Sequence, residues 1–185
     1  MSSVSFSIRP ATAADGAAVL ELAPRLTEGI APWRDQARAL AAARSWLAGS
    51  LTDAVGGTGI VLVATVASHS ALPGTVWPGD GPQSDGPSTV AQPGPGVVGV
   101  LSIRPTRHFT GEHDGYIGEL AVSEHAARQG IGRALIEAAE SWARDAGLTN
   151  LTLHTGTYNT NARAFYAALG FTEEEVRLTR PVTPA

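Results

Sequence analysis

The sequence contains neither cysteine nor lysine among its 185 residues. Without cysteine, the protein has no disulfide scaffold, no thiol nucleophile and no zinc or iron–sulfur centre held by cysteines. Without lysine, it has no P-loop, because that phosphate-binding motif requires a lysine after its last glycine. None of its own side chains can therefore supply a thiol or a lysine amino group to a reaction.

Basic charge and long apolar runs are also scarce. The 13 basic residues, all arginine, are outnumbered by 17 acidic ones, which gives a net charge of −4 and no basic face for nucleic acid or an anionic membrane. The longest apolar run, residues 59–67, is much shorter than the about 20 residues that cross a bilayer. Residues 1–10 lack the apolar core of a signal peptide. We expect a cytoplasmic protein with no nucleic-acid partner and no membrane partner.

The residues that are present indicate one α/β domain over residues 1–185. With 43% hydrophobic residues, a chain of this length can bury a sizeable core. Residues 68–96 interrupt the pattern, because 16 of these 29 residues are Gly, Pro or Ser and cannot form a packed core. We interpret this segment as a flexible insertion, an enlarged hairpin loop between two strands. A domain boundary is the alternative, disfavoured because neither half makes a complete sheet.

Hydrophobic periodicity predicts strands and helices along the rest of the chain. Each predicted helix ends at a proline or a glycine. Trp46 and Trp142 follow the apolar stripes of their helices and are expected in the core. The predicted strands cover residues 5–9, 60–66, 97–103, 116–122, 151–154 and 171–178, and the predicted helices cover 12–23, 33–48, 130–146 and 160–169.

The junction between the strand at 116–122 and the following helix carries the most specific pattern. Gly130 and Gly132 lie where the loop becomes the helix, so an anion can approach the free N–H groups of the first turn. The helix dipole and the flanking Arg128 and Arg133 add positive charge. A dinucleotide fold is disfavoured, because a leucine occupies the place of the third glycine of its motif. The junction predicts a site for phosphate or pyrophosphate.

Three motifs together resemble the GCN5-related N-acetyltransferase (GNAT) family. They are I-R-P-A-T-x-x-D at residues 8–15, L-A-V followed by R-Q-G-I-G-R-A-L within residues 120–135, and N-x-x-A-x-x-F-Y-x-x-L-G-F at residues 159–171. The similarity covers most of the chain outside 68–96. It implies an α/β fold in which helices flank a central mixed β-sheet, splayed open near its middle, with acetyl-CoA as co-substrate in the split.

The resemblance also implies roles for individual residues. The main chain of Leu120 and Val122 would contact the pantetheine arm and the thioester. Asn159 would contact the same arm, and Tyr166 would be the general acid that protonates the departing CoA thiolate. Ala127 replaces the Arg or Gln that usually opens the family's phosphate motif, so we expect weaker or reshaped anion binding. The pyrophosphate would be held by the amides of Arg128, Gln129, Gly130, Ile131, Gly132 and Arg133.

Acetyl transfer to an amine also needs a base that takes a proton from the ammonium form of the acceptor. Glu119 lies on the strand that leads into the phosphate loop and is the first candidate, directly or through a water. Its alternative role is a structural one, as an exposed residue or the partner of a nearby arginine. His154, at the end of the next strand, is the second candidate. Together with Glu119, Glu112 and Asp114 would make the mouth of the site acidic and attract a cationic amine.

Two further groups of residues bear on the acceptor site. Trp33 would supply an apolar or cation–π wall in the region that shapes the acceptor pocket of the family, although a core or surface position is an equal alternative. The segment at 106–115 contains His108, His113 and Asp114. Because these side chains share no helical or strand spacing, we interpret the segment as a solvated loop and predict no metal site.

The sequence therefore predicts an enzyme, an N-acetyltransferase that moves the acetyl group of acetyl-CoA to a primary amine of a small molecule or peptide. Attack would be direct, in a ternary complex, since no cysteine is present to carry the acetyl group. Two alternatives stay open: a non-catalytic acyl-CoA-binding or regulatory module on the same fold, and a protein-interaction domain that docks through residues 68–96. The resemblance favours a homodimer.

Overall fold

The computed structural model describes residues 5–55, 57, 59–66, 96–180 and 182. Its strands form one sheet in the order β1-β2-β3-β4-β5. Neighbours from β1 to β4 are antiparallel, while β5 runs parallel to β4, so the sheet is mixed as the resemblance implied. The strands are β1 (Phe6–Pro10), β2 (Ile60–Val66), β3 (Gly96–Arg107), β4 (His113–Val122) and β5 (Asn150–Leu153).

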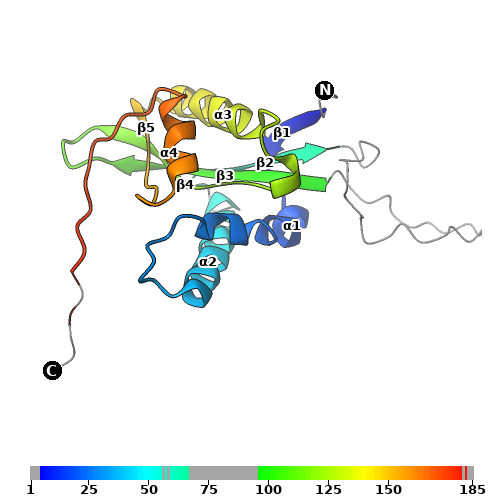
Figure 1. Cartoon of the computed structure of the whole chain (residues 1–185). Coiled ribbons are helices and arrows are strands. Elements are labelled where there is room, and N and C mark those ends of the chain that lie inside the picture. Colours follow the sequence, from blue (N-terminus) through cyan, green and yellow to red (C-terminus); the bar gives the residue numbers. More distant parts are fainter. Residues whose placement is uncertain (1–4, 56, 58, 67–95, 181, 183–185) are drawn as a thin grey trace, which may run out of the picture.

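Helices cover both faces of this sheet. α3 lies on one face and α1 and α2 lie on the other, while α4 lies beside β4 and β5 (Figure 1). None of the helices in the described part of the chain has the length and apolar character needed to cross a membrane. The helices are α1 (Gly16–Leu20), α2 (Gln36–Val55), α3 (Ile131–Asp145) and α4 (Thr160–Ala167), with short 3-10 turns η1 (Ala13–Asp15), η2 (Ala23–Thr27) and η3 (Glu124–Ala126).

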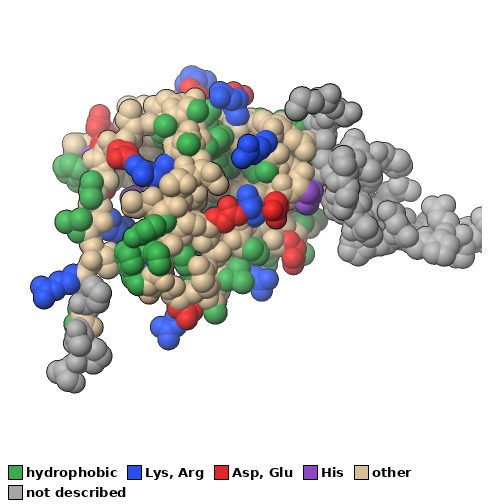
Figure 2. Space-filling model, in the orientation of Figure 1, with side chains coloured by type: hydrophobic (Ala, Val, Ile, Leu, Met, Phe, Trp, Pro, Cys, Tyr) green, Lys and Arg blue, Asp and Glu red, His purple; other side chains and the backbone are tan. Residues whose placement is uncertain are grey.

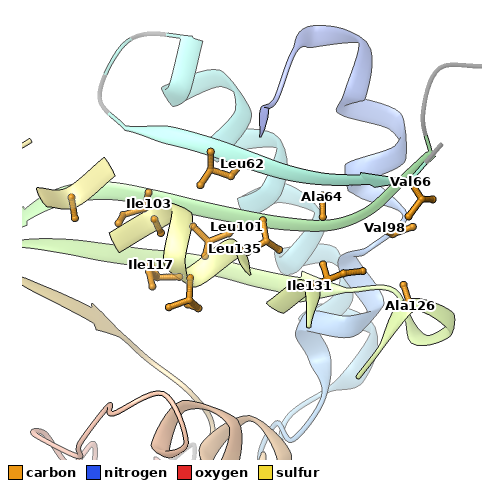
Figure 3. Packing of buried hydrophobic residues seen from close by; sticks show 13 residues of the cluster. Leu62, Ala64, Val66, Val98, Leu101, Ile103, Ile117, Ala126, Ile131 and Leu135 are labelled. Atoms are coloured by element: carbon orange, nitrogen blue, oxygen red, sulfur yellow. The ribbon is translucent and has the colours of Figure 1, made fainter. Parts of the chain in front are cut away.

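Each face of the sheet has its own hydrophobic core, and β2 contributes to both. Leu62 and Ala64 pack toward α3, in the cluster that includes Ile131 and Leu135 (Figure 3). Val63 packs on the opposite face, in the cluster that includes residues of α1 and α2. The six residues that follow the first residue of β2 are all buried. This confirms the prediction of a strand covered on both sides.

The sheet opens between β4 and β5. β5 pairs with β4 from Asp114 only as far as Ile117, whose partner is Leu153. Beyond that point, the edge of β4 from Gly118 to Val122 has no strand partner within the described residues. The sheet is therefore splayed, as the resemblance implied, and backbone groups of β4 lie along the opening.

A β-bulge marks the same place on the other edge of β4. The register between β3 and β4 shifts between Leu101 and Ile103, so that Gly118 and Glu119 together stand opposite Ser102. A bulge of this kind adds one residue to a strand and redirects the side chains that follow it.

The bulge decides which face of the sheet Glu119 points to. Ile117 belongs to the core against α3, whereas Ala121 belongs to the core against α1 and α2. In a regular strand these two residues would point to the same face, because side chains alternate. Glu119 is the second residue of the bulge and contacts Ser50 of α2. The face that it shares with Ala121 is therefore set by the bulge.

The predicted final strand at 171–178 is not present. Residues 171–180 have no regular secondary structure, and the side chains of Val176 and Leu178 are exposed. Apolar and charged residues alternate only at 176–178, and no strand of the described residues pairs with this segment.

Two predicted helices have different bounds. The helix predicted at 12–23 is divided into η1, α1 and η2, and its start is held by Asp15, which accepts hydrogen bonds from Thr12 N and the Arg9 guanidinium, each at 2.7 Å. The helix predicted to end before Gly49 continues to Val55. Gly49 has no close neighbour that a Cβ would meet and no left-handed conformation, so nothing in its backbone ends the helix.

The insertion predicted at 68–96 lies outside the described residues except for Gly96. The strands on either side of it, β2 and β3, are antiparallel neighbours, and Val66 pairs with Gly96. Neighbouring antiparallel strands are the pair that a hairpin connection joins. The organisation of residues 1–185 as one domain stays a prediction.

Candidate active site

A cleft of about 190 Å³ lies where the sheet opens. Its walls come from the bulged part of β4, the residues that follow β5, the side of α4 that faces the sheet, the segment around η2, and Trp46 of α2. Glu119, His154, Asn159 and Tyr166, which the sequence singled out from separate segments, all line this cleft. The fold thus brings four candidate residues to one place.

Glu119 is buried in the wall of the cleft and only 7% exposed. Its Oε2 accepts a hydrogen bond from Ser50 Oγ at 2.9 Å and a second, short one from Ser102 Oγ. The main-chain N–H of Glu119 also donates to Ser102 Oγ, at 3.1 Å. Two hydroxyls therefore hold one carboxylate oxygen, and Glu119 has the buried position and fixed orientation that a positioned base requires.

Tyr166 comes to the cleft from α4 and is half-buried. Its ring meets Phe165 and Phe171 edge-on, with centroids 5.2 and 5.5 Å apart. Burial raises the pKa of Tyr166 to about 12, because the apolar surroundings disfavour the phenolate. The phenol therefore keeps its proton at neutral pH and can donate it, which suits a general acid.

The predicted phosphate loop has an unusual backbone. Arg128 (φ 62°) and Gly130 (φ 83°) are both in the left-handed region, which is rare for a residue with a side chain. The amides of Arg128, Gln129 and Gly130 donate to no carbonyl of the described residues. The amides of the first turn of α3 follow, and a helix leaves these without internal partners. Successive free amides at a helix start form a concave site for an anion.

The side chains of the loop point away from it or into solvent, whereas its amides are free to bind an anion. Gln129 turns back toward η3, and its Nε2 donates to the carbonyl of His125 at 3.4 Å. Arg128 and Arg133 are exposed on either side of Gly130. The backbone supplies directed donors, and the two guanidinium groups add positive charge, so the loop fits a pyrophosphate although Ala127 replaces the usual polar residue.

Gly132 has a second role that the sequence did not reveal. A Cβ at this position would lie 3.2 Å from Cζ of Phe165. The start of α3 therefore packs directly against the aromatic residue next to Tyr166 on α4. This contact sets the distance between the phosphate loop and the helix that carries the candidate acid.

Three other predicted cofactor contacts are placed as follows. Leu120 lines the cleft on the unpaired edge of β4. The carbonyl of Val122 accepts a hydrogen bond from Arg25 Nε at 3.0 Å. Asn159 caps α4, because its Oδ1 accepts from Ala162 N at 3.1 Å while its Nδ2 donates to the carbonyl of Glu28, also at 3.1 Å. Its side chain thus joins α4 to the segment after η2.

His154 also belongs to a small cluster on the cleft wall. Its Nδ1 lies 3.2 Å from the hydroxyl of Tyr116, and the two rings meet edge-on. The guanidinium of Arg104 lies over the other ring, 5.0 Å from the centroid of Tyr116. His154 is therefore oriented by Tyr116 and stays the second candidate base.

Several predicted contributions to the acceptor site are not brought to the cleft. Asp114 is buried at the other end of β4, where its Oδ1 accepts from Asn150 Nδ2 at 3.0 Å. Glu112 lies in the turn between β3 and β4, near His108. The expected acidic mouth of Glu112, Asp114 and Glu119 therefore does not form, because Asp114 and Glu119 lie toward opposite ends of β4.

No group of three metal-binding side chains is found in the described part of the chain.

Of three tryptophans with a predicted position, Trp33 and Trp46 lie elsewhere and Trp142 lies as expected. Trp33 is exposed and packs edge-on against Tyr158, with ring centroids 5.8 Å apart, and is not part of the cleft wall. Trp46, expected in the core, is 64% exposed and lines the cleft. Trp142 is half-buried against the α3 core, as expected. Ser50, Ser102 and Trp46 are the site residues that sequence reasoning missed, since no local motif marks a lone serine or distinguishes the two sides of an alanine-rich helix.

The face that looks toward the viewer in Figure 2 carries arginine and acidic side chains interspersed, with hydrophobic side chains gathered near α4 and the connection between η2 and α2. Mixed charge of this kind agrees with the small net charge of the sequence.

Solved structures share this fold. A putative acetyl transferase from Pyrococcus furiosus superposes with a TM-score of 0.67 over 96% of this chain and 100% of that one, at 18% identity. An acetyltransferase from Trypanosoma brucei gives a TM-score of 0.60 over 96% of this chain and 100% of that one, at 21% identity. At such low identity, these similarities show the fold alone.

Sequence similarity leads to the family. The chain is 34% identical over 83 residues to N-acetyltransferase 8F1 of Rattus norvegicus, an alignment that covers 44% of this chain and 38% of that protein. It is 39% identical over 79 residues to aminoglycoside N(6')-acetyltransferase type 1 of Klebsiella aerogenes, which covers 40% and 49% respectively. The chain thus matches less than half the length of either relative. The sequence profile of the acetyltransferase (GNAT) family matches residues 67–171, more than half of the chain. The chain therefore belongs to the GNAT family of acetyltransferases.

Proposed function

We propose that the protein is an enzyme that transfers the acetyl group of acetyl-CoA to a primary amine by direct attack in a ternary complex. The observation that carries this proposal is the convergence of Glu119 and Tyr166, from β4 and α4, on one cleft at the opening of the sheet. The position of the phosphate loop supports it, because the loop leads from β4 and η3 into α3, and α3 packs against α4 through Gly132.

Glu119 acts first in the proposed reaction. Its carboxylate accepts a proton from the ammonium group of the acceptor, directly or through one water, so that the nitrogen gains a free electron pair. The nitrogen then attacks the thioester carbonyl. A C–N bond forms, the C–S bond breaks, and the electron pair of that bond leaves with sulfur. The nitrogen then releases to water the second proton that the amide product does not keep.

Tyr166 acts at the other end of the transfer. Its phenol donates a proton to the departing thiolate, which leaves as the thiol of CoA. The raised pKa of Tyr166 keeps this proton in place until sulfur becomes negative. Charge that develops on the carbonyl oxygen requires a donor, and backbone N–H groups along the unpaired edge of β4, near Leu120, are suitably placed.

The loop at 128–133 holds the pyrophosphate of the donor in this proposal. Its free amides, the start of α3 and the two flanking arginines supply the donors and the charge. The acceptor is the amine of a small molecule or a peptide, and the printed name of the Klebsiella aerogenes relative, an aminoglycoside acetyltransferase, agrees with the former. A cytoplasmic location, a homodimer, and the absence of metal, nucleic-acid and membrane partners stay predictions.

Calorimetric titration with acetyl-CoA and with CoA, without acceptor, tests the donor site first. We expect saturable binding in the micromolar range, followed by release of thiol when amines are added. Binding without turnover of any amine would instead support a non-catalytic acyl-CoA-binding module. Absence of binding up to millimolar ligand would contradict the donor site and direct attention to protein partners, with deletion of residues 68–96 as the corresponding test.

A further inference from the structure

The charges of the cleft wall limit the kind of amine that it can accept. Among the described residues, Arg25, Glu28 and Glu119 are the Arg, Asp and Glu side chains of this wall. Arg25 forms an ion pair with Glu28 and also donates to the carbonyl of Val122. Glu119 has hydroxyl partners instead. The cleft therefore offers one acidic group that is not neutralised by an ion pair, which matches one ammonium group.

A large aromatic surface lies next to that acidic group. Trp46 is four residues before Ser50 on α2, so the two side chains share a face of the helix, about 5–6 Å apart at Cβ. Ser50 Oγ donates to Glu119 Oε2 at 2.9 Å. Trp46 thus stands one helical turn from the hydroxyl that holds the candidate base; it is largely exposed and lines the cleft.

The wall also carries several apolar side chains, beside polar ones such as Thr155 and Asn159. Leu26 and Ile30 come from the segment around η2, and Leu120 and Leu153 come from β4 and β5. A polyamine or another polycation would place its additional ammonium groups against these side chains, where an unpaired charge loses hydration without gaining a partner. An apolar body would instead bury surface there, and a ring would stack on the indole.

We propose that the acceptor carries a single primary amine on an apolar, aromatic body, with the amine at Glu119 and the ring against Trp46. This inference rests on the proposed acetyl transfer and adds the class of its acceptor. Trp46 is in this role a specificity-determining residue, and it is distinct from the proton-transferring residues Glu119 and Tyr166.

Three amines test the inference: 2-phenylethylamine, ethanolamine and spermidine. Thiol release should show a kcat/KM at least tenfold higher for 2-phenylethylamine than for the other two. Trp46→Ala should lower that value about tenfold, mainly through KM, and should lower the value for ethanolamine by a clearly smaller factor. Trp46→Phe should keep most of the preference. Phe109→Ala, which removes an aromatic ring that is 85% exposed in the turn between β3 and β4, is the matched control and should change neither value.

A binding measurement separates failure of the inference from failure of the proposed function. The same amines are titrated calorimetrically into the complex of the protein with CoA, where no acetyl group is transferred. Binding of 2-phenylethylamine that is lost in Trp46→Ala, without turnover in the kinetic assay, would support the acceptor class and contradict the catalytic proposal. Turnover with equal or higher efficiency for spermidine or ethanolamine would support acetyl transfer and overturn the acceptor class. If 2-phenylethylamine does not bind, the acceptor class is also overturned.

Discussion

The hydroxyl of Ser102 makes two hydrogen bonds to Glu119, one as acceptor and one as donor. Oγ of Ser102 accepts the main-chain N–H of Glu119 at 3.1 Å and donates to Oε2 of the same residue. The β-bulge makes both contacts possible, because two residues of β4 stand opposite Ser102 alone. One side chain of β3 thus holds the backbone of the bulge and the carboxylate of the candidate base together.

Replacement of Ser102 by alanine should lower turnover with little effect on donor binding. A hydrogen bond to a charged group contributes about 1.5–3 kcal/mol, which corresponds to roughly a tenfold to hundredfold loss of kcat. The check is thiol-release kinetics together with calorimetric affinity for acetyl-CoA. Ser7→Ala, which removes a hydroxyl bonded to Thr65 away from the cleft, is the matched control. Unchanged kcat in Ser102→Ala would show that Glu119 needs no such support.

Replacement of Tyr166 by phenylalanine should remove the proton donor and keep the ring. We expect kcat to fall about a hundredfold, within the usual range for a lost general acid, while acetyl-CoA affinity changes less than threefold. The ring contacts with Phe165 and Phe171 remain available in the variant, so its thermal midpoint should stay close to that of the wild type. Full turnover in this variant would remove Tyr166 from the mechanism.

The raised pKa of Tyr166 predicts a late ionisation. Burial moves the pKa from 10 to about 12, so this phenol should remain protonated as the pH rises through 10 and the rate should have no alkaline decline due to it below about pH 11. Phenolate absorbance measured between pH 8 and 11 should be the same for the wild type and Tyr166→Phe. A smaller signal in the variant within that range would mean that the phenol ionises normally.

Replacement of Gly130 by alanine should weaken acetyl-CoA binding through the backbone. The left-handed conformation (φ 83°) costs an L-residue about 1–2 kcal/mol, while no atom within 4 Å obstructs a Cβ. The loop must either bear this strain or change shape, and we expect a loss of about tenfold in calorimetric affinity. Gly16→Ala is the control, because Gly16 also has open space but an ordinary helical conformation. Equal affinities in the two variants would contradict the assignment of the phosphate loop.

Replacement of Asp15 by asparagine should destabilise the fold in a pH-dependent way. Hydrogen bonds from the Arg9 guanidinium, opposed by burial and aided by Thr12, hold the pKa of Asp15 well below its usual value. The native state therefore favours the carboxylate, and its contribution is present above about pH 4 and lost as the pH falls toward the native pKa. Because Arg9 is partly exposed, the effect at pH 7 should be about 1–2 kcal/mol.

Urea denaturation at pH 7 and pH 2.5 measures this difference. The free energy of unfolding of Asp15→Asn should be lower than that of the wild type at pH 7, and the gap should narrow at pH 2.5. Glu137→Gln removes an exposed negative charge from α3 and is the control. Its difference from the wild type in the free energy of unfolding should not change between pH 7 and pH 2.5. A gap that is constant with pH would mean that the ion pair contributes through shape rather than charge.

The local patterns of the sequence predicted much of the fold correctly. β2 has the predicted bounds, since a continuous β-branched run has few alternatives to a buried strand. α3 begins after Gly130 and is followed by the left-handed Gly147, as predicted, because helix ends depend on residues that are neighbours in the chain. The strand predicted at 171–178 was wrong for the complementary reason: a strand needs a partner edge, and the residues of the segment do not show whether one is available.

The candidate site also has residues that a local motif could indicate and residues that only the fold could place. The anion site predicted at Gly130 and its neighbours depends on the backbone of six consecutive residues, so the motif alone could suggest it. Glu119 was found by its place on the strand before that loop, but its partners Ser50 and Ser102 lie 69 and 17 residues away in sequence. Trp46 was misplaced, because an alanine-rich helix has a weak apolar stripe and its sequence does not show which side packs on the sheet.

The sequence by itself determined the turn of glycines before α3, the central strands and the family, because glycines in a turn, β-branched runs and helix ends act through neighbouring residues. The tertiary structure alone decided how the site is assembled. Pairing of β5 with only part of β4 opens the sheet, the bulge opposite Ser102 turns Glu119 toward α2, and packing of α2 leaves Trp46 in the cleft. Each of these depends on contacts between segments that are distant along the chain, and such contacts leave no local pattern.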